Sequence, residues 1–168
     1  TSMSYIVSGY IYNPSTERLA GNVHGSILLS FLNGTNLIST KESAMFTPSS
    51  PANTWMYFSV TNRAPMSGSI TGRISAAFLG ATTGVIGGAL YFDGLCVTAT
   101  NIPFNPTQNG ALHNPGFEDT AAGTGLAGID SWTALGDAGA VDATYAHSGA
   151  NSLKIYYPGT LVQQDWAA

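Results

Sequence analysis

Charged side chains are scarce in this sequence. Asp, Glu, Lys and Arg make up 8% of its 168 residues, against about 25% in an average soluble domain. Five Lys and Arg stand against nine Asp and Glu, so the formal net charge is −4. A chain so poor in cations lacks the basic surface that binds nucleic acid or anionic lipid. We therefore expect no nucleic-acid partner and no membrane insertion.

Cysteine and long apolar runs are also scarce. The single cysteine, Cys96, excludes an internal disulfide. It lies in an apolar segment, which favours a buried, inert thiol over a reactive or intermolecular one. No apolar run is long enough to cross a bilayer. The sequence begins Thr1-Ser2-Met3 without a visible signal peptide, so we expect a processed chain or a slice of a longer one.

The residue patterns of common catalytic sites are missing as well. The histidines His24, His113 and His147 lie far apart with no ligand spacing around them. There is no Gly-x-Ser-x-Gly sequence, and nothing sets a serine beside a histidine and an acid. No pair of acids has a recognisable glycosidase setting. We expect the protein not to be an enzyme.

Hydrophobic residues, by contrast, amount to 44% of the chain, so the low charge does not indicate disorder. They alternate with small polar residues in short segments bounded by Gly, Pro and Asn, which is typical of strands. Asn33-Gly34 is a strong signal for a tight hairpin. No segment of helical length has a convincing helical period. We predict an all-β fold, a two-sheet antiparallel β-sandwich, with strands over 4–12, 25–32, 35–40, 55–61, 69–78, 89–100, 112–118, 140–145, 151–157 and 160–165.

Three short motifs follow one another in the last third of the chain: Asn114-Pro115-Gly116-Phe117-Glu118, Ser131-Trp132 and Ser148-Gly149-Ala150-Asn151-Ser152-Leu153. The first is a turn, because Pro presets φ and Gly accepts positive φ. Trp132 is large and apolar, which favours a core position. The three motifs resemble the opening of the β-jelly-roll carbohydrate-binding modules of the galactose-binding-like type, found in xylanases and laminarinases. There the pattern reads N-x-G-F-E, then W, then S-G-x-x-S-L.

The rest of the resemblance lies at the other end of the chain. The strands that follow these motifs in the family match Tyr5–Tyr12, Thr54–Val60 and Leu90–Asp93, so the module order is apparently permuted. We divide the chain into 1–100, the C-terminal part of a jelly-roll module; 101–111, a linker; and 112–168, the N-terminal part of the same or the next module. Either the module is circularly permuted, or the chain is one period of a tandem repeat. A head-to-tail contact of the second kind propagates as a filament or array.

The resemblance also implies a structural calcium ion. In that family the ion is held by the Glu of the first motif, by the S-G loop and by the Asp of a late F-D strand. The matching positions are Glu118, the loop containing Ser148 and Asn151, and Asp93. Calcium prefers such hard oxygen ligands. The alternative is that Asp93 and Glu118 only accept hydrogen bonds from turn amides.

A glycan surface would need exposed aromatic rings flanked by amides or acids. Tyr10 and Tyr12 share one strand face, and Gln163 and Gln164 lie on what we expect to be a neighbouring strand, with Trp166 close by. These five residues are the candidate ligand-binding set. The same mixture of Tyr and Gln would also suit a protein–protein contact.

Three functions remain open. The preferred one is a non-catalytic extracellular or cell-surface structural module that assembles with identical copies of itself. The alternative is a carbohydrate-binding module that targets an attached glycoside hydrolase to a polysaccharide. A phage or virus surface jelly roll is a third option.

Overall fold

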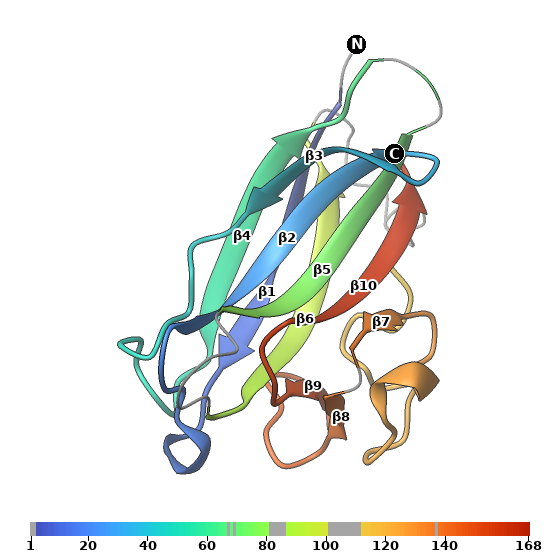
Figure 1. Cartoon of the computed structure of the whole chain (residues 1–168). Coiled ribbons are helices and arrows are strands. Elements are labelled where there is room, and N and C mark those ends of the chain that lie inside the picture. Colours follow the sequence, from blue (N-terminus) through green and yellow to red (C-terminus); the bar gives the residue numbers. More distant parts are fainter. Residues whose placement is uncertain (1–2, 67, 69, 81–86, 101–111, 137) are drawn as a thin grey trace.

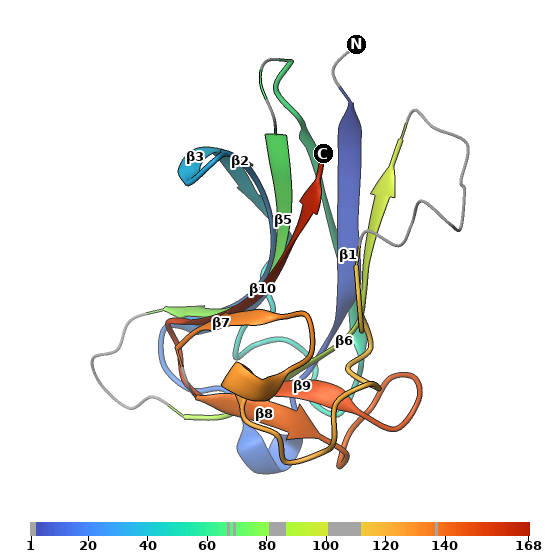
Figure 2. The same cartoon turned by 90° about the vertical axis from the view of Figure 1, so that its right-hand side faces the viewer.

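The computed structural model describes residues 3–66, 68, 70–80, 87–100, 112–136 and 138–168. These residues form two five-stranded antiparallel sheets packed face to face, which confirms the predicted sandwich (Figures 1 and 2). Two short 3-10 helices, η1 (Ser15–Glu17) and η2 (Leu126–Gly128), lie in connecting loops. No helix in the described part of the chain is long and apolar enough to span a membrane.

The first sheet has the strand order β4-β1-β6-β9-β8. Its strands are β4 (Met56–Arg63), β1 (Ser4–Tyr12), β6 (Leu90–Ala99), β9 (Ser152–Ile155) and β8 (Gly139–Asp142). The second sheet has the order β3-β2-β5-β10-β7. Its strands are β3 (Asn36–Glu42), β2 (Val23–Asn33), β5 (Ile70–Gly80), β10 (Thr160–Ala167) and β7 (Thr133–Leu135). Each sheet thus combines strands from residues 4–99 with strands from residues 133–167.

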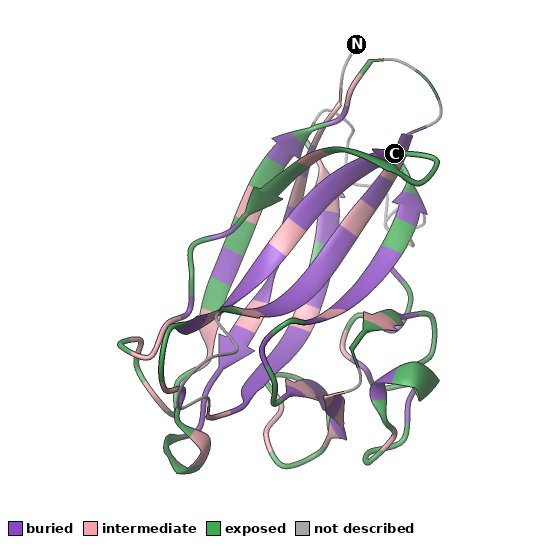
Figure 3. Ribbon diagram, viewed as in Figure 1, coloured by how far each residue is buried: buried purple, intermediate pink, exposed green. Residues whose placement is uncertain are grey.

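The core lies between the sheets and follows from the alternation along each strand. Successive side chains in a strand point to opposite faces, and in β1 every second residue from Tyr5 to Ile11 is buried against the other sheet. Strands β2, β5 and β10 are buried over most of their length (Figure 3). The fully buried side chains include Val7, Ile11, Ile27, Leu29, Phe31, Ile74, Phe78, Leu90, Phe92 and Val162.

The first and last strands meet at one end of the sandwich (Figure 1). The rings of Tyr5 in β1 and Trp166 in β10 pack across the core with their centroids 5.9 Å apart. Trp166 lies against Gly72 of β5, which has no side chain to displace it. Apolar contact across the core therefore joins the beginning of β1 to the end of β10.

Two local expectations are wrong, and one strand was missed. Leu112–Glu118 is not a strand, because Asn114 and Phe117 adopt left-handed φ values of 49° and 63° and turn the chain. The short strand β7 was not expected. Cys96 is exposed rather than buried, since it lies on the outer face of the first sheet. The proposed linker, 101–111, falls outside the described residues.

Candidate functional sites

Two carboxylates hold the loop 147–151 through its backbone amides. Asp93, in β6, is fully buried. Its Oδ2 accepts hydrogen bonds from the amides of His147 and Ser148, both at 2.8 Å, and its Oδ1 accepts one from its neighbour Gly94 at 2.6 Å. The Ser148 hydroxyl lies 3.5 Å from the same Oδ2.

Glu118 holds the second half of that loop. Its two carboxylate oxygens accept the amide N–H of Ala150 at 3.0 and 3.1 Å, and Oε1 also accepts that of Asn151 at 3.0 Å. The structure therefore brings together all four residues of the expected calcium site: Asp93, Glu118, Ser148 and Asn151.

The electrostatics of Asp93 reflect two opposing effects. Burial raises the pKa of the Asp93 carboxyl above its ordinary value, because the charged form is removed from water. The amide N–H groups of Ser148, Gly94 and His147 oppose that rise in pKa, since they stabilise the ionised form. Among the described residues, neither Asp93 nor Glu118 forms an ion pair with a basic side chain. Backbone amides are therefore the main groups that stabilise the ionised form of Asp93, and the nearby imidazole of His147 makes a smaller contribution that also lowers the pKa.

The turn at Gly116 runs close to both acidic residues. A methyl group added at Gly116 would be 3.4 Å from Asp93 Oδ1 and 3.8 Å from Glu118 Cγ. An ionised carboxylate has about four lone-pair sites, and Asp93 Oδ1 accepts a single N–H. Both carboxylates keep acceptor capacity, so the donor set fits calcium. The described residues contain no cluster of three or more His, Cys, Asp or Glu side chains, so backbone carbonyls or water would have to complete the coordination.

An aromatic cluster covers the outer face of the first sheet near the C-terminal end of β1. The ring of Tyr10 stacks on His147 at a centroid distance of 3.6 Å and meets the edge of Tyr57 at 5.4 Å. Tyr12 packs against Trp55 and Tyr145, at 5.1 and 5.0 Å. Tyr12 is buried by these neighbours, whereas Tyr57 is 58% exposed. Of the two tyrosines in the predicted set, only Tyr10 retains partial exposure.

The two glutamines do not join this cluster. Strand β10 pairs with β5 and β7, in the sheet opposite β1, so the expectation that β10 neighbours β1 is wrong. Gln164 points toward the core, where its Nε2 donates to the carbonyls of His113 and Ser131 at 3.0 and 2.7 Å. Its Oε1 accepts the amide of His113 at 2.7 Å. Trp166 is buried in the core. These contacts give Gln164 and Trp166 structural roles.

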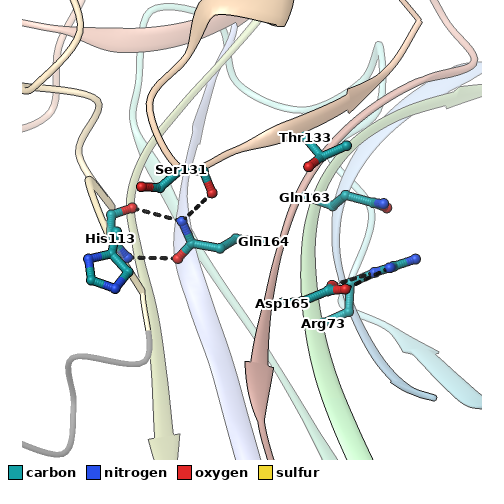
Figure 4. A pocket seen from close by; sticks show the side chains of 7 residues that line it. All are labelled: Arg73, His113, Ser131, Thr133, Gln163, Gln164 and Asp165. Carbon is teal, nitrogen blue, oxygen red and sulfur yellow. Dashed lines mark hydrogen bonds and ion pairs between the residues drawn. The ribbon is translucent and has the colours of Figure 1, made fainter. Parts of the chain in front are cut away.

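Gln163 instead lines a small polar hollow beside β10 (Figure 4). The hollow has a volume of about 240 Å³. Arg73 and Asp165 form a bidentate ion pair beside it, at 2.5 and 2.8 Å. The full lining is Arg73, His113, Ser131, Thr133, Gln163, Gln164 and Asp165. Arg73, His113 and Thr133 were not expected here, because sequence spacing does not reveal that β10 lies between β5 and β7.

One side of the sandwich presents the outer edges of both sheets. Strand β4 ends the first sheet and β3 ends the second, and no other described strand pairs with either outer edge. The Asn62 side chain links the two strands by donating to Ser39 Oγ at 3.2 Å. On β3, Leu37 and Ile38 are 63% and 46% exposed. This side therefore combines unpaired backbone with exposed apolar side chains.

No protein-family model matches the chain, and no curated protein sequence or solved structure matches it significantly. The fold is an all-β sandwich compatible with a jelly roll. Inference about function therefore depends on the residues themselves.

Proposed function

We propose that the protein is a non-catalytic, extracellular structural module that assembles with copies of itself. The observation that supports this proposal is the side of the sandwich where β3 and β4 both end their sheets. Unpaired strand edges are templates for pairing with another chain. Leu37 and Ile38 add exposed apolar surface there, which would be buried in a contact between copies.

The sparse charge supports the same proposal. Charged residues make up 8% of the chain, so few like charges oppose the approach of a second copy. Depletion of charge is a feature of the buried centre of protein–protein interfaces.

Self-assembly predicts a mass that depends on concentration. We expect sedimentation and light scattering to show species larger than 17.4 kDa as the protein is concentrated, and electron microscopy to show ordered assemblies. A monomer at every concentration would contradict the proposal. If that monomer is retained on insoluble polysaccharide, the carbohydrate-binding alternative is favoured, and the hollow lined by Gln163, Arg73 and Asp165 is where its site should be sought.

We also propose that a calcium ion binds between Asp93 and Glu118. Its role would be structural, because it would join β6 to the loop 147–151 and to the turn that contains Gly116. The acceptor capacity of the two carboxylates and the closeness of both acidic residues to Gly116 support this proposal.

Removal of calcium is expected to lower the melting temperature, since an ion that binds only the folded state stabilises it. The measurement is a thermal melt in chelator and again after calcium is restored, with magnesium as the control ion. Identical melts in all three conditions would mean that the amide hydrogen bonds alone hold the loop.

A further inference from the structure

The outward-facing backbone of β4 follows from its pairing with β1. The amide of Ala64 donates to the carbonyl of Met3 at 2.8 Å, and the register of the two strands continues unbroken from that pair to Met56 opposite Ile11. In an antiparallel ladder, the residues that bond to one neighbour alternate with residues that face the other way. The N–H and C=O groups of Tyr57, Ser59 and Thr61 therefore point away from β1, toward the open edge.

This edge lacks the features that normally prevent pairing. Proline, lysine and β-bulges protect exposed strand edges. Strand β3 has two of them, because it carries Lys41 and its register with β2 shifts at Phe31/Leu32. Over residues 56–62, β4 has no proline, no charged residue and no shift in its register with β1; its single charged residue, Arg63, is the last of the strand and lies beyond the segment that would pair. The edge strands β7 and β8 at the other side have only three and four residues. Among the described residues, β4 is the long unprotected edge.

The sequence of this edge complements its own copy. When two Tyr57–Thr61 segments are placed antiparallel with Ser59 opposite Ser59, each Tyr57 faces a Thr61 and each Phe58 faces a Val60. Aromatic side chains opposite β-branched ones are favourable cross-strand pairs. No charged residue is brought opposite another. A shift that centres the pairing on Val60 would instead place Phe58 opposite the polar Asn62, which already bonds to Leu29 and Ser39 inside the sandwich.

The structure also sets an end to the paired segment. The amide of Arg63 donates to the Oδ1 of its neighbour Asn62 at 2.9 Å. That N–H is therefore already satisfied, whereas the three outward-facing residues before it have the geometry to pair. An antiparallel pair exchanges two hydrogen bonds at each such position, so the three positions would form about six.

We propose that two copies of the chain pair through β4, antiparallel about a two-fold axis at Ser59, and so join two five-stranded sheets into one continuous sheet. The proposal rests on the proposed function, self-assembly, and names one of the surfaces that it would use. Such a contact is isologous, since each copy contributes the same segment. It would also bring the exposed Leu37 and Ile38 of β3, on the same side of the sandwich, close to the second copy.

Cysteine cross-linking tests both the surface and the register. Ser59→Cys would be made in a Cys96→Ser background, because the exposed Cys96 could form disulfides of its own. Directly opposed residues of a hydrogen-bonded pair lie about 5.5 Å apart between Cα atoms, within the range of about 4.4–6.8 Å that disulfides allow. We expect mild oxidation to give a covalent dimer. The matched control is Thr61→Cys, whose two copies would lie about 13 Å apart, four residues along the strand.

A charge substitution tests the non-covalent contact. Ser59→Lys would place two ammonium groups side by side at the two-fold axis, and like charges directly opposite one another destabilise strand pairing. We expect at least a tenfold weaker self-association by sedimentation, with the monomer's melting temperature unchanged. Thr144→Lys adds the same charge at an exposed position after β8, at the far edge of the sheet, and should leave association intact.

The outcomes distinguish the β4 contact from the more general proposal of self-assembly. Cross-linking at Ser59→Cys, its absence at Thr61→Cys and loss of association in Ser59→Lys support the β4 contact. If the wild-type protein associates while Ser59→Cys stays uncross-linked and Ser59→Lys associates normally, the β4 contact is wrong and self-assembly uses another surface. A wild-type monomer at all concentrations overturns both.

Discussion

Replacing Asp93 with alanine is expected to lower the free energy of unfolding by about 3–5 kcal/mol. The substitution leaves the amides of Gly94, His147 and Ser148 without their acceptor. A fully buried donor left unsatisfied costs about 1–3 kcal/mol, and the lower end of that range applies to these three part-buried amides. Urea denaturation in chelator measures the loss without a contribution from bound metal.

Two further variants make this result specific. Asp119→Ala removes the same carboxylate from an exposed position nearby and should change the unfolding free energy by less than about 0.5 kcal/mol. Asp93→Asn keeps the shape but replaces one acceptor oxygen with an NH₂ group, so its stability should lie between those of the wild type and Asp93→Ala. If Asp93→Ala were as stable as Asp119→Ala, the loop 147–151 would not depend on this carboxylate.

Replacing Gly72 with alanine is expected to cost about 2–3 kcal/mol, because the new methyl group would overlap the indole ring of Trp166. That ring has little room to move, since Trp166 is buried and packs on Tyr5. The measurement is the free energy of unfolding in urea. Gly125→Ala is the matched control, because a methyl group there meets no atom within 4 Å and the backbone φ of −64° suits alanine.

A second substitution shows whether the overlap is the cause. Trp166→Phe removes the part of the indole ring that faces Gly72, and it breaks no hydrogen bond because Trp166 Nε1 has no partner among the described residues. The double variant Gly72→Ala/Trp166→Phe should be more stable than the sum of the two single effects predicts, by about 1 kcal/mol or more. If the two effects simply add, overlap with the Trp166 ring is not the cause of the stability lost in Gly72→Ala.

The strands of this fold were the most predictable feature. β1 was expected at 4–12 and occupies Ser4–Tyr12. The expected hairpin joins β2 to β3, but its turn residues are Gly34 and Thr35, one position later than the Asn33-Gly34 signal, because Asn33 still pairs with Asn36. Both depend on local signals, namely alternation and turn chemistry. Leu112–Glu118 failed because its apolar residues are buried by a turn: Phe117 is fully buried at a left-handed φ rather than in a strand.

The candidate sites also differ in how well the sequence predicted them. The motif resemblance pointed to Asp93, Glu118, Ser148 and Asn151, and the structure brings these four together. The expected pairing of Tyr10 and Tyr12 with Gln163 and Gln164 failed, because sequence patterns do not specify which sheet a strand joins. The hollow beside Gln163 and the open edge of β4 depend on long-range strand order, so neither was visible in the sequence.

Each sheet contains strands from residues 4–99 and strands from residues 133–167, and this arrangement has a consequence for folding. The pairing of β5 with β10 joins residues such as Ile74 and Gln164, and that of β6 with β9 joins Phe92 and Leu153. Closing such long loops costs entropy before any contact is gained, and proteins dominated by distant contacts fold slowly. Folding of the isolated chain should therefore take milliseconds to seconds. Amides in β1, β5 and β10 should exchange with solvent together, in one cooperative opening, because neither part of the chain completes a sheet alone.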